Sequence, residues 1–279
     1  MPVARRNGAE IYYEVRGEGP PLLLLEGLGY GLWMWRGQSP ALEKEFRLVL
    51  VDNRGVGRSS PLPGPYTILE FARDALAVLD AEKLERVAVL GVSMGGLIAQ
   101  SLAELAPGRI DAAILVSTLA GGPDARPMPA ETLAELMRVV PGEAPADRIR
   151  RTMRLALTPT FLQEHAPELE AIIADRLAAL QPPEQWTYQA MAGRAFDARA
   201  SDARLSIPVL ILTGTEDRVV PWANSLVLYR LLPRASLTIF HGQNHLLPIE
   251  RATEFNDAVA RFLRSVADGT FAPSGEEVG

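Results

Sequence analysis

Short apolar runs alternate along the chain with segments whose apolar residues recur at helical spacing. The apolar runs have the length of β-strands and cover residues 11–15, 22–25, 47–51, 87–90, 110–116, 208–212 and 236–240. The segments with helical spacing cover residues 94–105, 223–231 and 250–266, and a further helix follows the capping box at residues 67–70. Strands that are apolar throughout and separated by helices predict an α/β fold, with a mostly parallel sheet covered by helices on both faces.

The strand pattern stops between residues 121 and 203. Helical segments there are interrupted by prolines, namely Pro141, Pro145, Pro159, Pro167, Pro182 and Pro183. We interpret 121–203 as a helical cap insertion over the edge of the sheet, and 1–120 together with 204–279 as the core. The tail after Asp268 is expected to fray.

Composition narrows the class of protein. The chain has 279 residues, 48% apolar and 22% charged, which is enough for one large domain with a sizeable core. A net charge of −6 gives no basic excess, so we expect no nucleic-acid partner. No apolar run approaches the ~20 residues of a membrane span, and the N-terminus lacks the apolar region of a signal peptide, so we expect a cytoplasmic protein that does not bind membranes.

The chain has no cysteine and only three histidines. Disulfides, thiolate nucleophiles and cysteine-based zinc sites are therefore excluded, and a histidine-rich metal centre is not expected.

The sequence Gly91-Val-Ser93-Met-Gly95 has the pattern G-x-S-x-G and lies directly between a predicted strand and a predicted helix. Small neighbours allow the strand and the helix to approach each other around a strained turn that exposes the serine hydroxyl. The helix N-terminus adds partial positive charge where negative charge would develop. The alternative is a tight turn that contains a serine by coincidence, and the strand–turn–helix context favours a nucleophile.

A serine hydroxyl is a weak nucleophile unless a base removes its proton, and a histidine is the expected base. His245 lies in the loop between the last core strand and the final helix. His241 lies at the end of that strand, where its side chain is less free, and His165 lies in the predicted cap, where the simplest interpretation is a surface residue. We predict His245 as the base, with His241 as its competitor.

An acid must fix the tautomer of the imidazole and stabilise its charged form. The turn after the strand at 208–212 contains Glu216 and Asp217. We predict Asp217, because the shorter acid suits a partner that reaches across from the next loop. Glu216 is the alternative, and its simplest interpretation is a solvated surface charge.

The order Ser93, Asp217, His245 is the nucleophile–acid–base order of α/β-hydrolases, and the chain resembles that superfamily over nearly its whole length. The segment DNRGVGRSS at residues 52–60 looks like the family's D-x-R-G-x-G-x-S turn. His245 is followed by Glu250 before the final helix, where Ala252 replaces a proline that the family often has. The chain looks most like small bacterial carboxylesterases and 3-oxoadipate enol-lactonase-like hydrolases. The resemblance implies an eight-stranded, mostly parallel sheet with a helical cap.

The loop after residues 22–25 contains Gly27, Gly29 and Gly31. A dinucleotide-binding loop would read G-x-G-x-x-G, which this loop does not, and the segment GVGRSS lacks the lysine of a phosphate-binding loop. The resemblance implies that the loop forms an oxyanion hole, with the backbone N–H groups of Leu28 and Met94 as donors. Each such donor is worth about 3 kcal/mol in the transition state.

Glu26 departs from the family, which commonly has His-Gly at the start of this loop. An ionised carboxylate near a developing oxyanion would oppose catalysis. The side chain therefore points away from the site, or pairs with a cation such as Arg54, or is kept neutral by burial. Our hypothesis is that Glu26 braces the loop through Arg54.

Four aromatic residues are candidates for substrate binding. Trp33 and Trp35 follow the glycine loop, and Trp186 and Tyr188 lie in the predicted cap. Packing in the protein interior is the alternative for all four.

Together these residues predict a serine hydrolase that cleaves carboxylic esters, short-chain or aryl, through an acyl-enzyme intermediate without cofactor or metal. Lactones, including enol-lactones, are an alternative substrate, and a cofactor-free perhydrolase would need the same triad. A small-molecule receptor on a hydrolase scaffold is the alternative of another class. The expected partner is a small-molecule ester or lactone, and the expected state is a monomer or a homodimer.

Overall fold

A single sheet forms the centre of the protein in the computed structural model, which describes residues 2–278 without the side chains of 276 and 277. Its nine strands in this part of the chain have the order β1-β2-β4-β3-β5-β6-β7-β8-β9. The strands are β1 (Val3–Arg6), β2 (Ala9–Arg16), β3 (Pro21–Leu25), β4 (Arg47–Val51), β5 (Val87–Val92), β6 (Ile110–Val116), β7 (Val209–Gly214), β8 (Ala235–Phe240) and β9 (Gly275–Val278). β2 is antiparallel to both of its neighbours, and all other pairs are parallel. The prediction of a mostly parallel α/β sheet is confirmed.

The central strands are apolar because they are buried on both faces. In β3, Leu23 and Leu25 belong to the core on one face of the sheet, whereas Leu22 and Leu24 belong to the core on the other. All four side chains are fully buried. Side chains alternate across a strand, so a continuous apolar run is what a strand between two helical layers requires.

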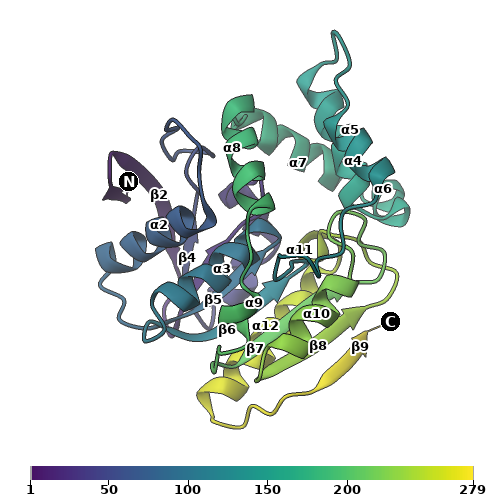
Figure 1. Cartoon of the computed structure of the whole chain (residues 1–279). Helices are drawn as coiled ribbons and strands as arrows, with labels where there is room; N and C mark the ends of the chain where they lie inside the picture. The colour runs from purple at the N-terminus through teal and green to yellow at the C-terminus, as the bar shows by residue number, and fades with distance from the viewer. Residues whose placement is uncertain (1, 279) are drawn as a thin grey trace.

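Helices cover both faces of the sheet (Figure 1). One face carries α2 (Ile68–Ala81), α3 (Met94–Leu105) and α10 (Ala223–Leu231). The other face carries the 3-10 helix η1 (Leu32–Gly37), α1 (Ser39–Leu42) and α12 (Ala252–Ala267), and the short helix α11 (Leu247–Glu250) precedes α12.

The predicted capping box begins α2. Thr67 is the N-cap residue, and its hydroxyl accepts a hydrogen bond from the Glu70 N–H at 3.3 Å. This bond satisfies one of the backbone donors that the first turn of a helix leaves without a partner.

A group of helices lies between β6 and β7 and covers one end of the sheet. These helices are α4 (Ala130–Met137), α5 (Pro145–Ala156), α6 (Pro159–Glu164), α7 (Ala166–Ala178) and α8 (Pro183–Arg194), and we call them the cap. Figure 1 shows the cap above the sheet, and α9 (Arg199–Asp202) beside the core.

Four prolines of the predicted insertion begin helices rather than interrupt them. Pro145, Pro159, Pro167 and Pro183 each lie in the first turn of a cap helix. A proline is tolerated there because the N–H that it lacks would have no partner within the helix.

The C-terminal tail differs from the prediction. Residues after Asp268 were expected to fray, but β9 pairs with β8 and extends the sheet beyond the eight strands that were expected. The Ser274 N–H donates to Ser236 Oγ at 3.0 Å, and Phe271 packs edge-on against Phe262. The tail is therefore held by the open edge of β8, whose backbone groups would otherwise have no partner in the sheet.

Among the helices of the described residues, none has the length and apolar character needed to cross a membrane.

Candidate active site

Ser93 lies on a strained turn between β5 and α3. Its backbone has φ 54° and ψ −116°, which a residue with a side chain rarely adopts. A Cβ on Gly95 would lie 2.0 Å from the Leu25 carbonyl oxygen, and one on Gly91 would lie 2.2 Å from the Gly95 carbonyl oxygen. Both glycines are therefore required where the strand and the helix meet around Ser93.

Asp217 and His245 are hydrogen-bonded to each other. Asp217 Oδ2 lies 2.8 Å from His245 Nδ1, and both residues are buried. The other oxygen, Asp217 Oδ1, accepts the N–H groups of Val219 and Val220, each at 2.8 Å. The carboxylate is thus held by the turn that follows β7 and directed at the imidazole.

Asn244 fixes the loop that carries His245. Its Oδ1 accepts the N–H of His245 at 2.8 Å, and its Nδ2 donates to the carbonyls of Leu155 and Leu157 at 3.3 and 3.2 Å. These two carbonyls lie at the end of α5, so the loop is fastened to the cap as well as to the core.

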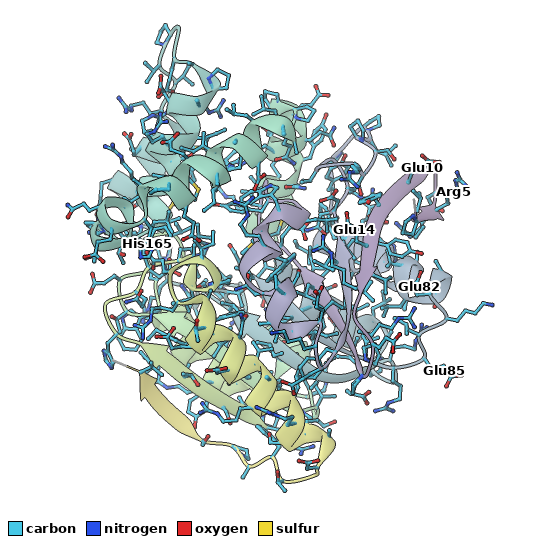
Figure 2. The ribbon with its side chains drawn as sticks, turned by 180° about the vertical axis from the view of Figure 1, so that it is seen from behind. Arg5, Glu10, Glu14, Glu82, Glu85 and His165 are labelled. Carbon is cyan, nitrogen blue, oxygen red and sulfur yellow. The ribbon has the colours of Figure 1, made fainter. Side chains whose placement is uncertain are left out.

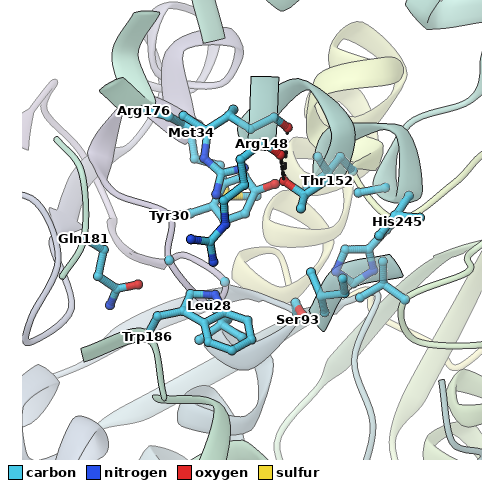
Figure 3. A pocket seen from close by; sticks show the side chains of 18 of the residues that line it. Leu28, Tyr30, Met34, Ser93, Arg148, Thr152, Arg176, Gln181, Trp186 and His245 are labelled. Atoms are coloured by element: carbon cyan, nitrogen blue, oxygen red, sulfur yellow. Dashed lines mark hydrogen bonds between the residues drawn. The ribbon is translucent and has the colours of Figure 1, made fainter. Parts of the chain in front are cut away.

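Ser93 and His245 line the same cavity, which has a volume of about 580 Å³. Figure 3 shows their side chains together on its floor. The cap forms the opposite wall, with Arg148, Thr152, Arg176, Gln181 and Trp186 among its side chains.

The glycine loop passes close to Ser93. A Cβ on Gly27 would lie 3.3 Å from the Ser93 Cβ, so this part of the backbone is in contact with the serine. In the described part of the chain, no hydrogen bond has the Leu28 N–H as its donor. Met94 is the first residue of α3, where backbone N–H groups have no partner within the helix. The two expected oxyanion donors are therefore available beside the serine.

The cap also supports the glycine loop. Gln189 of α8 is fully buried, and its Oε1 accepts the Gly29 N–H at 3.1 Å. Its Nε2 donates to the carbonyl of Arg54 at 3.1 Å. One side chain of the cap therefore connects the glycine loop to the neighbouring loop after β4.

Glu26 is completely buried and does not pair with Arg54. Its Oε1 accepts the Asn53 N–H at 2.9 Å, while Oε2 has no hydrogen-bond partner among the described residues. Arg54 instead forms two hydrogen bonds with Asp74 of α2, at 2.6 and 2.7 Å. The predicted Arg54 brace is wrong, because α2 presents a closer carboxylate to that guanidinium.

Burial raises the pKa of Glu26 well above its ordinary value, and the nearby Asp52 carboxylate raises it further. The hydrogen bond from Asn53 lowers the pKa and does not outweigh the burial. The direction of this shift favours the third option, in which burial disfavours the charged form of the side chain. A neutral carboxyl group next to the glycine loop does not repel an oxyanion.

Of the four aromatic candidates, only Trp186 lines the cavity. Trp35 is fully buried in the core, and Trp33 packs against the same core with Tyr30 at a ring distance of 5.0 Å. Tyr188 packs on Tyr66 instead, with the ring centroids 5.3 Å apart. The expectation that Trp33, Trp35 and Tyr188 bind substrate is not supported, since helical geometry turns them toward other packing surfaces.

The competing polar residues lie outside the cavity. His241 follows β8, and its N–H donates to the Val278 carbonyl of β9. Glu216 is exposed. His165 lies in the cap (Figure 2), and its ring stacks on that of Phe161. The structure therefore brings Ser93, Asp217 and His245 together and leaves their competitors elsewhere.

The polar residues on the cap wall were not predicted from the sequence. Arg148 and Thr152 of α5 are four residues apart, and the hydroxyl of Thr152 donates to the Arg148 carbonyl at 3.0 Å. Their spacing places both on one face of the helix. That face could be recognised in the sequence, but not the fact that it meets the cavity.

Within the part of the chain that the structure describes, no group of three or more histidine or acidic side chains is placed to hold a metal ion.

The fold and the strand–serine–helix turn define a hydrolase class, and the chain belongs to the alpha/beta hydrolase fold family, whose sequence model matches residues 20–252. It is 30% identical over 266 residues to a protein of Azorhizobium caulinodans named carbamate hydrolase RutD, covering 95% of this chain and 99% of that one. It is 29% identical to 3-oxoadipate enol-lactonase 2 of Acinetobacter baylyi, covering 89% of this chain and 90% of that one.

Among solved structures, the enol-lactonase from Burkholderia xenovorans is similar, with a TM-score of 0.82 and 28% identity. The match covers 94% of this chain and all of that chain (100%). The likeness to hydrolases therefore extends over the cap as well as the core.

Proposed function

We propose that the protein is a serine hydrolase that cleaves carboxylic esters through an acyl-enzyme intermediate. The observation that carries the proposal is the 2.8 Å contact between Asp217 Oδ2 and His245 Nδ1, with His245 and Ser93 on the wall of one cavity. An imidazole oriented by a buried carboxylate beside a serine on a strained turn is the arrangement that activates a hydroxyl.

In the first half of the reaction, Ser93 Oγ attacks the ester carbonyl carbon and its proton passes to His245 Nε2. The carbonyl oxygen becomes an oxyanion and accepts hydrogen bonds from the N–H groups of Leu28 and Met94. When the tetrahedral intermediate collapses, the bond to the leaving oxygen breaks. The alcohol leaves with the proton from His245, and the acyl group stays on Ser93.

In the second half, water attacks the acyl carbon and gives a proton to His245. The new oxyanion occupies the same hole. Collapse breaks the bond to Ser93 Oγ, which regains the proton from His245. One ester and one water become one acid and one alcohol, and the protein returns to its initial state.

Asp217 acts on His245 in both halves. It keeps the proton of the neutral ring on Nδ1, so that Nε2 is free to act as a base, and it stabilises the imidazolium that forms. The two hydrogen bonds from Val219 and Val220 hold the carboxylate in this orientation.

A lactone is the second candidate substrate, and the similarity to two proteins named enol-lactonases favours it. The chemistry is the same, except that the leaving alcohol remains tethered to the acyl group. Another relative is named as a carbamate hydrolase, so a carbamate is a further candidate substrate. It too would be attacked at its carbonyl carbon.

Turnover of p-nitrophenyl acetate and butyrate, followed by release of p-nitrophenol, tests the proposal. We expect multiple turnovers in the wild type, and loss of nearly all of that activity in Ser93→Ala and His245→Ala. His241→Ala is the matched control and should retain activity, because His241 lies outside the cavity.

Labelling with a fluorophosphonate gives an independent readout and should require Ser93. Multiple turnovers that persist in Ser93→Ala would overturn the serine mechanism. Binding of these esters without turnover in the wild type would favour a receptor on the hydrolase scaffold.

A further inference from the structure

Two arginines of the cap line the cavity from neighbouring helices. Arg148 lies on α5 and Arg176 on α7, and both side chains extend into the cavity above Ser93 (Figure 3). The Arg176 guanidinium lies over the ring of Tyr30, with Cζ 4.9 Å from the ring centroid. This contact and a hydrogen bond from Arg176 Nη1 to Met153 Sδ at 3.4 Å hold the guanidinium, and its other N–H groups remain able to bind a ligand.

Neither arginine forms a salt bridge within residues 2–278, although the charge of Arg148 acts on Glu143 of the cavity wall. Other arginines of α5 are paired: Arg150 with Asp147 and Glu170, and Arg151 with Glu143. The two exposed arginines of α5, Arg148 and Arg154, form no salt bridge within the described residues, and of these two only Arg148 lines the cavity.

Among the described residues, the one acidic side chain on the cavity wall, Glu143, offsets these two cations only in part. Glu143 is bound by Arg151 through two hydrogen bonds, at 2.8 and 2.9 Å. Its charge is thus already balanced by a cation outside the cavity. The lining of the cavity consequently carries a net positive charge from Arg148 and Arg176.

A buried amide adds a second, independent observation. Both Gln181 Nε2 and Gln181 Oε1 are buried and have no hydrogen-bond partner among the described residues. The side chain lines the cavity and lies against the glycine loop, where a Cβ on Gly29 would be 3.2 Å from Gln181 Oε1. Buried polar groups without partners are costly, so a polar ligand group is expected to complete this site.

We propose that this cavity selects esters or lactones that carry a carboxylate, with Arg148 and Arg176 binding the carboxylate and the Gln181 amide donating a further hydrogen bond. This inference rests on the proposed hydrolase function and names its substrate class. Guanidinium groups match the planar carboxylate in shape and charge. A neutral substrate of the same length leaves both cations without a counter-charge.

A matched pair of substrates tests the inference. The p-nitrophenyl monoester of adipic acid carries a free carboxylate, and the p-nitrophenyl methyl diester has the same chain with that charge removed. We expect kcat/KM for the charged ester to exceed that for the neutral ester by about 10-fold or more, the size of a charge-assisted hydrogen bond. Arg148→Gln and Arg176→Gln should each remove most of this preference, measured as the ratio of the two kcat/KM values within the same variant.

Arg154→Gln is the control, because Arg154 is an exposed arginine of α5 that does not line the cavity. It should keep the wild-type preference. Equal use of the two esters by the wild type, or an equal loss of preference in Arg154→Gln, would overturn the inference.

A binding measurement distinguishes failure of this inference from failure of the proposed function. Calorimetric titration of Ser93→Ala with monomethyl adipate should show binding that weakens about 10-fold when Arg176→Gln is added. If the wild type cleaves neither ester but this binding is seen, the hydrolase function fails and the anion site stands. If the neutral ester is cleaved and monomethyl adipate does not bind, the anion site fails and the hydrolase function stands.

Discussion

Glu250 Oε2 accepts the backbone N–H of Asn244 at 3.0 Å, one residue before His245. The other oxygen of Glu250 accepts the N–H of Thr158, which begins the cap helix α6. The half-buried carboxylate of Glu250 therefore joins the loop that carries His245 to the cap. Burial raises the pKa of Glu250, and these two backbone hydrogen bonds oppose the rise.

Glu250→Gln should weaken this junction. An amide has one acceptor oxygen, so either Asn244 or Thr158 loses its partner, at a cost of about 1–3 kcal/mol. For a chain of this size we expect the Tm to fall by a few degrees, because about 2–4 °C corresponds to each kcal/mol. kcat should fall more than KM rises, since the imidazole is displaced while the cavity wall is kept.

Glu254→Gln is the control for the Glu250 variant. Glu254 is exposed and pairs with Arg251 at the start of α12, and exposed ion pairs contribute little to stability. Its Tm and kcat should remain close to the wild type. A kcat unchanged in Glu250→Gln would show that Asn244 alone positions His245.

Most elements of the fold could be predicted because their signals are local. The helix α3 has the predicted bounds, since Ser93 and its glycines mark its start and the apolar spacing continues to Leu105. The choice of His245 over His241 also followed from position, because the loop after the last core strand is free to reach the sheet's edge and the strand is not. These inferences needed only the residues near each element.

The remaining features depend on which surfaces meet in three dimensions. The preference of Arg54 for Asp74 depends on α2 packing beside its loop, and no nearby pattern indicates it. Likewise, Arg148 and Arg176 share a cavity only because α5 and α7 pack together over the sheet. The helical pattern identified each helix but not the partner of each face.

Asp217→Asn should lower kcat by about 10⁴-fold if the carboxylate orients His245 as proposed. The amide can donate to Nδ1 and so favours the tautomer with its proton on Nε2, which cannot act as a base. Steady-state kinetics with p-nitrophenyl butyrate provide the measurement. Glu216→Gln is the matched control, because Glu216 is exposed and adjacent in the same turn; an equal loss in both variants would contradict the assignment.

Gly95→Ala should prevent the turn at Ser93 from forming. The added Cβ would lie 2.0 Å from the Leu25 carbonyl oxygen, a backbone atom of the central sheet that cannot move aside cheaply. We expect a loss of stability of about 3 kcal/mol, the upper end of the usual range for overpacking, measured by urea unfolding.

Gly108→Ala is the corresponding control, because a Cβ there has nothing within 4 Å. Its stability should stay close to the wild type. If Gly95→Ala unfolded at the same urea concentration as Gly108→Ala, the close approach of strand and helix at Ser93 would not be required for folding.

Glu26→Gln should stabilise the protein relative to the wild type, by an amount that grows as the pH rises. The pKa of Glu26 is raised in the folded state, whereas in the unfolded chain it is about 4.3. Between these two pKa values the folded state binds more protons than the unfolded state, so this residue lowers the free energy of unfolding as the pH increases toward the folded pKa. Glutamine does not titrate, and its Oε1 can still accept the Asn53 N–H.

Urea unfolding at about pH 5 and about pH 8 should show that the free energy of unfolding of Glu26→Gln exceeds that of the wild type by an amount that grows with pH. Glu18→Gln, an exposed position, controls for the removal of one carboxylate. Activity toward p-nitrophenyl butyrate should be retained, because a neutral amide replaces a neutral acid beside the glycine loop. An advantage that did not change with pH would mean that Glu26 is ionised in the folded protein, and the oxyanion would then form beside a negative charge.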